Sequence, residues 1–290
     1  MKKSKTLPYL LILPSFIIMV VFVVYPIIVT FFYSLRKMKL TAPKDTAFIG
    51  FNNYIVTLKS FDFWYSLQNS IMIMIIVVVI CIVFGLLFAS ILNFESRLKN
   101  ILMAIAVIPW ALPPVVNGIL WKWIFYPGYG FFNKILYNLN FIDEPIQYLS
   151  NRYSLMIIIG IVIAWRNIPF CSIILLSAMR AIPDVVYDAA SIDGANKVQM
   201  FTRVTLPLLM PALGIILTFT SISAINVFDE VVAISGYSNL GKTILLEDYM
   251  ITFSFLDFGR GSALTYLIMI IAGILGMLYI RAMSRKIDYI

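Results

Sequence analysis

One stretch of the sequence matches the pattern of a phosphate-binding loop. Residues 236–243 read GYSNLGKT, which fits G-x-x-x-x-G-K-[ST], and they follow a strand-like stretch at 231–235. Such a loop binds phosphate because its backbone N–H groups and the helix after it are held at the edge of a parallel sheet. Too few residues separate the apolar stretches on either side for such a sheet to form. We therefore interpret residues 236–243 as a chance match to the pattern.

A second set of polar residues lies within apolar stretches. Arg166 is in AWRNIPF, residues 164–170, near the middle of a stretch long enough to cross a membrane. An arginine at that depth costs ~2.5–3.5 kcal/mol, so we expect Arg166 to face protein or water instead of lipid. Two interpretations stay open: Arg166 lines a path for a solute, or it pairs with an acid of this chain or of a partner subunit. The candidates for lining a path, or for supplying that acid, are Asn117, Trp121, Trp165, Arg166, Asn167, Phe170, Asn226, Asp229 and Glu230.

The residue types that most often carry catalysis or bind metals are missing or unsuitably placed. The sequence has no histidine, which removes His-based general acid–base chemistry, nucleophiles activated by histidine, and His-ligated zinc or haem. Cys81 and Cys171 both lie in apolar runs, so we expect neither a disulfide nor a thiolate metal site. We therefore predict no catalytic residue, no metal site and no cofactor bound by this chain itself.

The composition places the chain in a membrane. Of the 290 residues, 61% are hydrophobic and 12% are charged, whereas a soluble domain is roughly 45–50% apolar and roughly 25% charged. So little charge could not cover a water-facing surface, which excludes a soluble enzyme, a disordered chain and a small disulfide-bonded secreted domain. The net charge is +8, but no basic stripe with interleaved aromatic residues is visible, so we do not expect nucleic-acid binding.

Six stretches have the ~20 mostly apolar residues that a membrane-spanning helix needs. They are residues 7–33, 70–92, 101–125, 155–179, 208–234 and 263–282. We therefore predict an all-α integral membrane protein with six transmembrane helices and both termini on the same side.

The basic residues hardly distinguish the two sides of the membrane. The loops on the side of the termini hold 11 of the 22 Lys and Arg residues and the other loops hold 10, with Arg166 inside a span. The lysines among the first five residues favour cytosolic termini. The first apolar run is longer than a signal-peptide core and lacks a cleavage site, so we expect it to remain as a span. We predict a cytosolic N-terminus at 1–6 and a single membrane domain over 7–290.

The loop between the predicted fourth and fifth spans, residues 180–207, has the features of two short helices joined by a turn. Pro183 suits the first turn of a helix, and Asp184 then lies near the positive end of the helix dipole. Gly194 can adopt the left-handed conformation that ends a helix. A second helical piece is predicted over 196–206.

The first of these two helices has a side that another protein could contact. Val185, Asp188 and Ala189 fall on one side of it, and Ala189 and Ala190 are small enough for another backbone to approach closely. The loop is therefore either a rigid projection that binds in the cleft of a cytosolic partner, or only an interfacial connector between two spans.

The residues of this loop resemble a known motif. YDAASIDGA at 187–195, followed by Phe201 and by VTLP at 204–207, is similar to the EAA loop of binding-protein-dependent ABC importer permeases. More narrowly, it is similar to the sugar-type permeases of the maltose, multiple-sugar and glycerol-phosphate importers. The typical pattern is E-A-A-x-x-D-G-A, then F, then an apolar-x-L-P end. Asp188 stands where the family usually has Glu, which keeps the charge with a reach one methylene shorter.

Weaker matches in the same order extend this resemblance over nearly the whole chain. They are Phe51–Tyr54, Ile108–Val116 with Trp121 and Lys122, Asn133 with Leu136, Trp165 with Pro169 and Phe170, and Phe228–Val231. The resemblance implies a type I, MetI-like fold with a cytosolic coupling helix between spans four and five, and a single permease domain with its core over 65–282. At 235–238 the chain has SGYS where the family usually carries a T-x-G-G-P-like turn, in a loop expected to meet the protein that delivers the solute.

The resemblance implies a membrane subunit of an ATP-driven importer of a sugar or oligosaccharide, multi-pass in the bacterial cytoplasmic membrane. The implied partners are the lipid bilayer, a second homologous permease, two cytosolic ABC ATPase subunits that use ATP and Mg²⁺, and an extracytoplasmic substrate-binding protein. Aromatic faces and hydrogen-bond donors around Arg166 would suit sugar hydroxyls. The residues that would couple the chain to the ATPases are Tyr187, Asp188, Ala189, Ala190, Asp193, Gly194, Ala195 and Phe201.

Other classes of protein remain to be distinguished. A self-sufficient secondary transporter or channel often shows inverted repeats and ionisable relays near the midplane, and neither is visible here. An ABC importer of a non-sugar solute such as glycerol phosphate fits the same motifs. A membrane-bound nucleotide-binding enzyme would rest only on residues 236–243.

Overall fold

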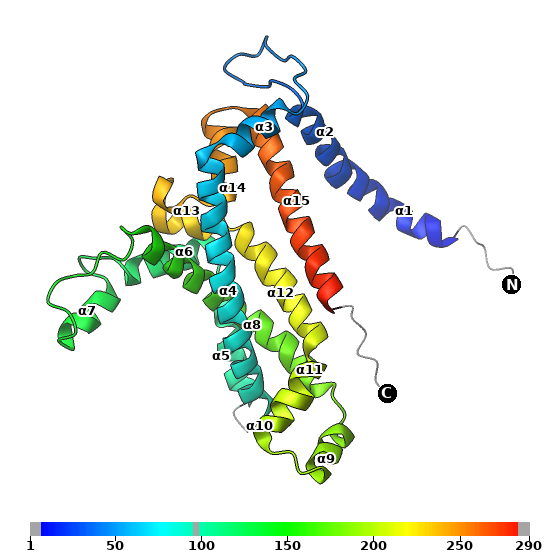
Figure 1. Ribbon diagram of the computed structural model, residues 1–290, viewed down its shortest axis with the longest axis vertical. Helices are drawn as coiled ribbons and strands as arrows, with labels where there is room; N and C mark the ends of the chain where they lie inside the picture. The colour runs from blue at the N-terminus through cyan, green and yellow to red at the C-terminus, as the bar shows by residue number, and fades with distance from the viewer. Residues whose placement is uncertain (1–6, 95–98, 284–290) are drawn as a thin grey trace. The chain divides into compact units, whose positions relative to one another are not determined.

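The computed structural model describes residues 7–94 and 99–283, so the predicted cytosolic segment 1–6 lies outside the described residues. The described chain is helical with isolated β-bridges, in agreement with the all-α prediction (Figure 1). Its residues form two compact units. The first comprises Met1–Trp64 with Glu247–Ile270, and the second comprises Tyr65–Leu246 with Ile271–Ile290.

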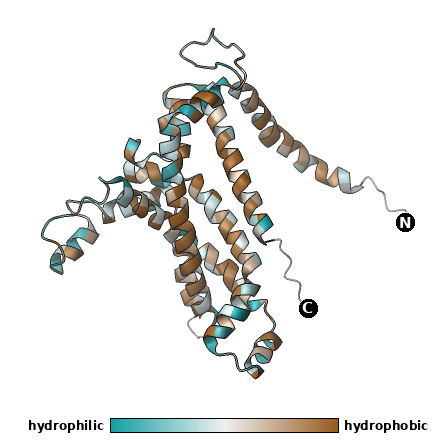
Figure 2. Ribbon diagram, viewed as in Figure 1, coloured by the Kyte–Doolittle hydropathy of each residue, from teal (hydrophilic) through white to brown (hydrophobic). Residues whose placement is uncertain are grey.

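Four helices are long and apolar enough to cross a membrane, and two bent helix pairs bring the number to as many as six. The four are Tyr9–Ser34, which includes α1 (Leu7–Met19) and α2 (Tyr25–Ser34), then α4 (Phe61–Asn93), α8 (Arg152–Arg180) and Phe258–Arg281 of α15 (Phe258–Met283). Figure 2 shows these helices as predominantly hydrophobic along most of their length. The described helices therefore agree with a multi-pass membrane protein of four to six spans.

The third predicted span, 101–125, is not one straight helix. α5 (Lys99–Ala111) ends before two consecutive prolines, and α6 (Pro114–Ile124) restarts at an angle of 95° to the preceding helix. The proline ring fixes φ and removes a backbone donor, so it starts a helix readily and continues one poorly. Pro113 has extended backbone angles and serves as the N-cap residue of α6.

The fifth predicted span, 208–234, is also interrupted. α12 (Met210–Ile225) is bent by 65° from the helical stretch Lys197–Leu208 before it. It ends at Asn226, and a separate short helix, α13 (Asp229–Ser235), follows. The stretch 231–235, interpreted above as strand-like, is thus helical, because its β-branched residues pack in a helix on α6. The remaining helices of this region are α7 (Phe131–Asn138) and α14 (Ile244–Tyr249).

The first unit is held together by hydrogen bonds around α3 (Asn52–Lys59). The Asn53 side chain donates to the backbone carbonyls of Ser34 and Arg36, at 2.8 and 2.9 Å. The Tyr54 and Ser34 hydroxyls lie 2.7 Å apart. Gly259, at the start of α15, lies so close to this turn that a Cβ would meet the Arg36 carbonyl oxygen at 2.4 Å. The Phe51–Tyr54 stretch thus fixes the end of the first span.

The first span presents an apolar surface that the rest of its own unit leaves uncovered. The most hydrophobic window of Tyr9–Ser34 is 0% buried, although a mostly apolar helix is stable only against lipid or another protein. Its backbone is hydrogen-bonded within the helix, so the helix itself needs no partner to form. This surface therefore needs lipid, or protein from outside its own unit, to cover it.

A buried carboxyl group joins α14 to α15 within the first unit. Asp248 is 8% exposed and accepts hydrogen bonds from the hydroxyls of Thr265, at 2.7 Å, and Thr252, at 3.5 Å. The pKa of Asp248 is raised from its ordinary value of 3.8 to about 6, chiefly by burial and also by the neighbouring Glu247, against the lowering effect of the two threonine hydrogen bonds. The folded chain therefore keeps a proton on this carboxyl up to a higher pH than the unfolded chain does.

We expect Asp248→Asn to remove a pH dependence of stability. A carboxyl whose pKa is raised by folding stabilises the fold below its unfolded pKa, and this stabilisation is lost as pH rises through the folded value. The loss is about 3 kcal/mol at most between pH ~4 and pH ~6. Thermal unfolding of the detergent-solubilised chain should show the asparagine variant gaining stability over the natural protein as pH rises through this window. An equal difference at every pH would contradict the assignment.

The second unit packs α4, α5 and α12 around α8. α8 carries a long series of buried side chains, including Ile159, Ile163 and Leu175. α4 approaches it closely at two glycines. A Cβ on Gly160 would lie 2.6 Å from Ile76 of α4, and a Cβ on Gly85 would lie 3.2 Å from Cys171. The position of α8 is therefore fixed along most of its length, and polar groups near its middle are held in place by this packing.

Candidate functional site

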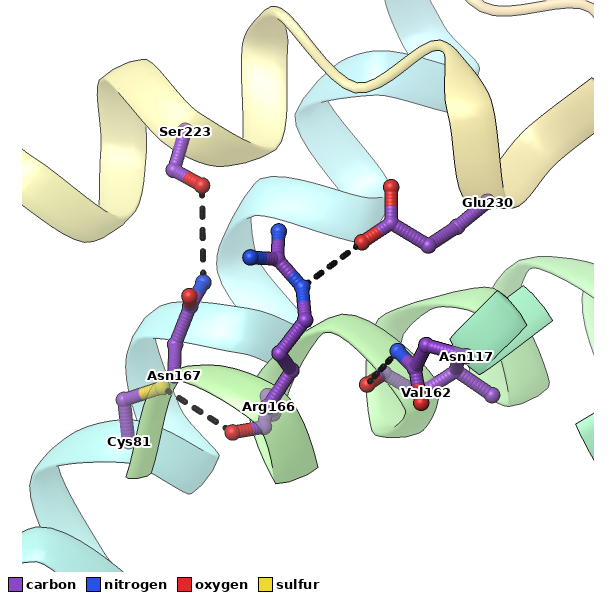
Figure 3. Close-up of polar contacts among 8 residues, drawn as sticks. Cys81, Asn117, Val162, Arg166, Asn167, Ser223 and Glu230 are labelled. Carbon is purple, nitrogen blue, oxygen red and sulfur yellow. Dashed lines mark hydrogen bonds and ion pairs between the residues drawn. The ribbon is translucent and has the colours of Figure 1, made fainter. Parts of the chain in front are cut away.

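The middle of α8 carries a buried ion pair. The Arg166 Nε donates to the Glu230 Oε1 of α13 at 2.9 Å, with 19% and 4% of the two side chains exposed (Figure 3). Of the two acids considered from the sequence, Glu230 is thus the partner, and Asp229 is exposed at the start of α13. The arginine faces protein, as its cost in lipid requires.

Two asparagines lie on either side of this ion pair. The Asn167 side chain donates to the Ser223 hydroxyl of α12 at 3.4 Å, and the Asn117 side chain of α6 donates to the Val162 carbonyl at 3.1 Å (Figure 3). The Asn117 Oδ1 is buried with no hydrogen-bond partner among the described residues. Such an oxygen costs free energy unless a water, a solute or another subunit donates to it. This place in the second unit therefore has capacity for a polar ligand.

Aromatic side chains surround the polar groups in two pairs. Trp121 of α6 lies edge-on to Trp165, with ring centroids 5.6 Å apart. Phe170 packs against Phe219 of α12 at 4.3 Å. Asn226 stands apart, exposed at the end of α12. Of the nine path candidates, seven thus lie in or beside these contacts, and Asn226 and Asp229 are exposed.

A close helix crossing holds α6 against α13. A Cβ on Gly118 would lie 2.6 Å from the Ala233 Cβ and 3.1 Å from the Glu230 backbone, so only glycine fits without displacing one helix. Since Asn117 precedes this glycine and Glu230 lies in the partner helix, the crossing positions both polar groups. No local sequence signal predicts this crossing, because the two helices are far apart along the chain.

The loop after α8 forms the two predicted helical pieces. The first is α9 (Asp184–Ile192), and the second runs through α10 (Lys197–Gln199), a π-helical segment at Met200–Thr205 and α11 (Leu206–Leu208). Gly194 between them has φ +78°, a conformation that glycine adopts freely. Asn196 and Gln199 cap the second piece, each side chain bonding to the other's backbone N–H. The predicted helix–turn–helix is confirmed.

The eight predicted coupling residues point in two directions. Asp188, Ala189, Asp193 and Gly194 are exposed. Tyr187, Ala195 and Phe201 instead line a hollow of about 460 Å³ between α9 and the ends of α4 and α8, where the Tyr187 and Thr205 hydroxyls lie 3.3 Å apart. Ala190 is half-buried. Tyr187 thus ties α9 to the second helical piece, and the outward-facing residues form the free surface of α9.

The free surface of α9 is unusually apolar for an exposed helix. Val185 is 74% exposed and Ile192 is 86% exposed, and they flank Ala189 at helical spacing. Large apolar side chains grouped on one exposed face mark a surface that binds protein or membrane. The sequence placed Val185 on this face but gave no role to Ile192.

The phosphate-loop pattern at 236–243 does not form a phosphate site. Lys242 is only 5% exposed, and its backbone carbonyl accepts a hydrogen bond from Asn69 at 2.9 Å. Thr243 is fully buried, and the backbone N–H of Ile244 donates to the Ser70 hydroxyl at 2.9 Å. The segment is therefore closed against the start of α4, and the interpretation as a chance match agrees with this geometry.

Comparison with known proteins gives relatives over almost the full chain. Residues 81–289 match the family of binding-protein-dependent transport system inner membrane components. The trehalose/maltose transport system permease protein MalF of Thermococcus litoralis is 33% identical over 282 residues, covering 96% of this chain and 94% of the relative. The sulfoquinovosyl glycerol transport system permease protein SmoG of Agrobacterium fabrum is 31% identical over 285 residues, covering 98% and 92%.

A solved structure shows the same fold. A chain of a bacterial ABC transporter involved in the import of the acidic polysaccharide alginate superposes with a TM-score of 0.82 at 20% identity, covering 97% of this chain and 96% of the other. The described helices therefore adopt the fold of that membrane chain.

Proposed function

Because the chain belongs to the family of binding-protein-dependent transport system inner membrane components, we propose that it is a permease subunit of an ATP-driven carbohydrate importer. The observation that carries the proposal is α9, whose exposed face groups Val185, Ala189 and Ile192 beyond the end of α8. A helix with such a face suits a cleft in a motor subunit.

The proposed solute is a sugar or oligosaccharide. The relatives are named for trehalose and maltose and for sulfoquinovosyl glycerol, and the structural relative for alginate. All of these solutes carry sugar rings with several hydroxyls. The groups around Arg166, with paired aromatic rings, two asparagines and a serine hydroxyl, offer the donors, acceptors and ring faces that such solutes need.

The proposed partners are a second permease of the same family, two cytosolic ABC ATPase subunits and an extracytoplasmic binding protein. A related alginate transporter has been solved in complex with a periplasmic protein that holds an alginate pentasaccharide. ATP and Mg²⁺ would be used by the ATPase subunits, and this chain would bind no cofactor. The uncovered apolar face of Tyr9–Ser34 is available to lipid or to the second permease.

The proposed topology has six spans, if each bent pair crosses or enters the membrane once, in a single permease domain with its core over 65–282. Both termini and α9 would lie in the cytosol. Closure of the ATPases would then push on α9. α9 follows α8 after a short connection, and its Tyr187 hydroxyl lies 3.3 Å from that of Thr205, in the helical stretch that leads into α12. The push would therefore rock α8 and α12 as rigid bodies and alternate the access of the path.

Reconstitution tests this proposal. The chain is assembled in liposomes with its cognate permease, ATPases and binding protein, and uptake of radiolabelled trehalose and maltose is measured. We expect uptake that requires both ATP and the binding protein, and none by the chain alone. Uptake by the isolated chain without ATP would identify a secondary transporter or channel instead. Binding of ATP to the isolated chain would favour a nucleotide-binding enzyme.

A further inference from the structure

A second hollow, distinct from the groups around Arg166, opens at the far end of α8 from α9. It has a volume of about 550 Å³, within the roughly 300–1,000 Å³ range of small-molecule sites. Its walls come from the end of α6, the loops on either side of α7, the start of α8 and the end of α13. We call this hollow the outer cup. Its polar and aromatic lining residues are Lys122, Tyr126, Gln147, Ser150, Ser235 and Ser238.

The outer cup has an apolar floor and a polar rim. Leu155 and Ile234 line it and are almost fully buried, so the floor is part of the packed core. Around them stand an ammonium group, an amide and three serine hydroxyls. A hollow with a fixed apolar base and a few convergent polar groups is the usual form of a small-molecule site.

The rim groups have hydrogen-bonding capacity to spare. The Ser235 hydroxyl donates to the Val231 carbonyl at 2.9 Å, which leaves its oxygen free to accept. The Ser238 oxygen accepts from the Leu240 N–H at 3.2 Å, which leaves its proton free to donate. Within residues 7–94 and 99–283, no carboxylate lies at ion-pair distance from Lys122. The cup therefore offers donors and acceptors together, as a ligand with many hydroxyls requires.

One aromatic ring on the wall of the cup is held in a fixed orientation. Tyr126 stacks on Tyr129 with ring centroids 4.3 Å apart and planes 23° apart. An ordered aromatic face can pack against the C–H face of a sugar ring, which adds apolar contact without loss of side-chain freedom. The ring and the hydroxyls together match the two kinds of surface that a pyranose presents.

The cup is separate from both sites described above. Leu155 in its floor precedes Arg166 by eleven helical residues, which places the two about 16 Å apart along α8. Met179, beside the hollow behind α9, lies about 36 Å from Leu155 by the same measure. In the proposed topology the cup is on the outer side of the membrane, where the solute arrives. Ser235 and Ser238, which line it, belong to the loop at 235–238 that departs from the family pattern.

We infer that the outer cup is a saccharide-binding site on the permease itself, which takes one or two sugar rings before they reach the groups around Arg166. The site holds hydroxyls through Lys122, Gln147 and the serines, and it holds a ring face on Tyr126. This inference rests on the proposed function, because the ligand is the carbohydrate that the importer moves.

Protection of an introduced thiol tests the inference. Cys81 and Cys171, the two natural cysteines, are fully buried, so an alkylating reagent will report on an added cysteine. Ser238→Cys places a thiol in the cup, and Ser254→Cys places one at an exposed serine that does not line it. Each variant is assembled with its partner permease and ATPases in lipid nanodiscs, without the binding protein. Alkylation is timed with and without trehalose or maltose, whichever the transporter takes up.

We expect saturating sugar to slow alkylation of the Ser238→Cys thiol about tenfold, which corresponds to sugar bound in about nine of ten cups. Alkylation of the Ser254→Cys thiol should not change. Adding Lys122→Met should reduce this protection. Equal protection at both thiols, or none at either, would overturn the inference while ATP-dependent uptake persists. In a separate sample the binding protein is added without sugar. If it alone protects the Ser238→Cys thiol, the cup is a docking surface for that protein and the inference is overturned. If neither sugar is taken up, the proposed function fails and the cup inference falls with it.

Discussion

Ala189→Arg is expected to lower ATP-dependent uptake by at least about 100-fold while the chain still inserts and folds. Ala189 is exposed between Val185 and Ile192 on the free face of α9, so the new side chain meets only solvent in the isolated chain. In the proposed complex it would place an unpaired charge in a cleft shaped for small apolar groups. Such a charge costs about 3–5 kcal/mol, which corresponds to roughly 100- to 1,000-fold or more in affinity.

The measurement has two parts, retention of the solubilised chain on immobilised ATPase subunits and uptake in liposomes. Ala42→Arg, at another exposed alanine in the first loop, introduces the same side chain and should change neither. Gly194→Asp should also weaken retention, because φ +78° at this position strains any residue with a Cβ. If the Ala189→Arg chain is retained and transports normally, the motor does not contact α9 and the coupling proposal is wrong.

The sequence alone could predict the helices but not where the chain bends inside them. Gly194 and Pro183 are local signals with local consequences, and the helix–turn–helix followed from them. The breaks at 112–113 and 226–228 lie within apolar runs. Hydropathy shows how long such a run is, but it does not show whether the helix bends within it. Only the first break has a proline to mark it. The second depends on α13 packing against α6, a contact between distant parts of the chain.

The candidate site was predictable in chemistry and only partly in geometry. The cost of an arginine in a span required an acid nearby, and Glu230 was one of two candidates in reach. The choice between them follows from Gly118, which lets α13 approach α6 and turns Glu230 inward while Asp229 stays exposed. Asn53 and Asn69 carry comparable structural roles through bonds to backbone carbonyls, and the residue type alone gives no signal that identifies such partners.

Breaking the Arg166–Glu230 pair is expected to destabilise the chain strongly. Glu230→Leu leaves a guanidinium group buried without its carboxylate, and removing one partner of a buried pair costs about 3–5 kcal/mol. Thermal unfolding of the detergent-solubilised chain should show a large loss of stability, and uptake should fall with the amount of folded protein. A loss well below about 1 kcal/mol would show that the arginine reaches water, as an exposed ion pair would.

The double variant Arg166→Met with Glu230→Leu separates a structural role from a role in the path. Replacing both members of a buried pair by apolar side chains is often neutral or stabilising by about 1–4 kcal/mol, so we expect stability to return. Since the Nε is already bonded to Glu230 and most of the arginine is buried, we also expect uptake to recover to within about threefold. A double variant that is stable but does not transport would show instead that Arg166 contacts the solute. Trp165 and Asn167, its neighbours along α8, would then be candidates for the same path.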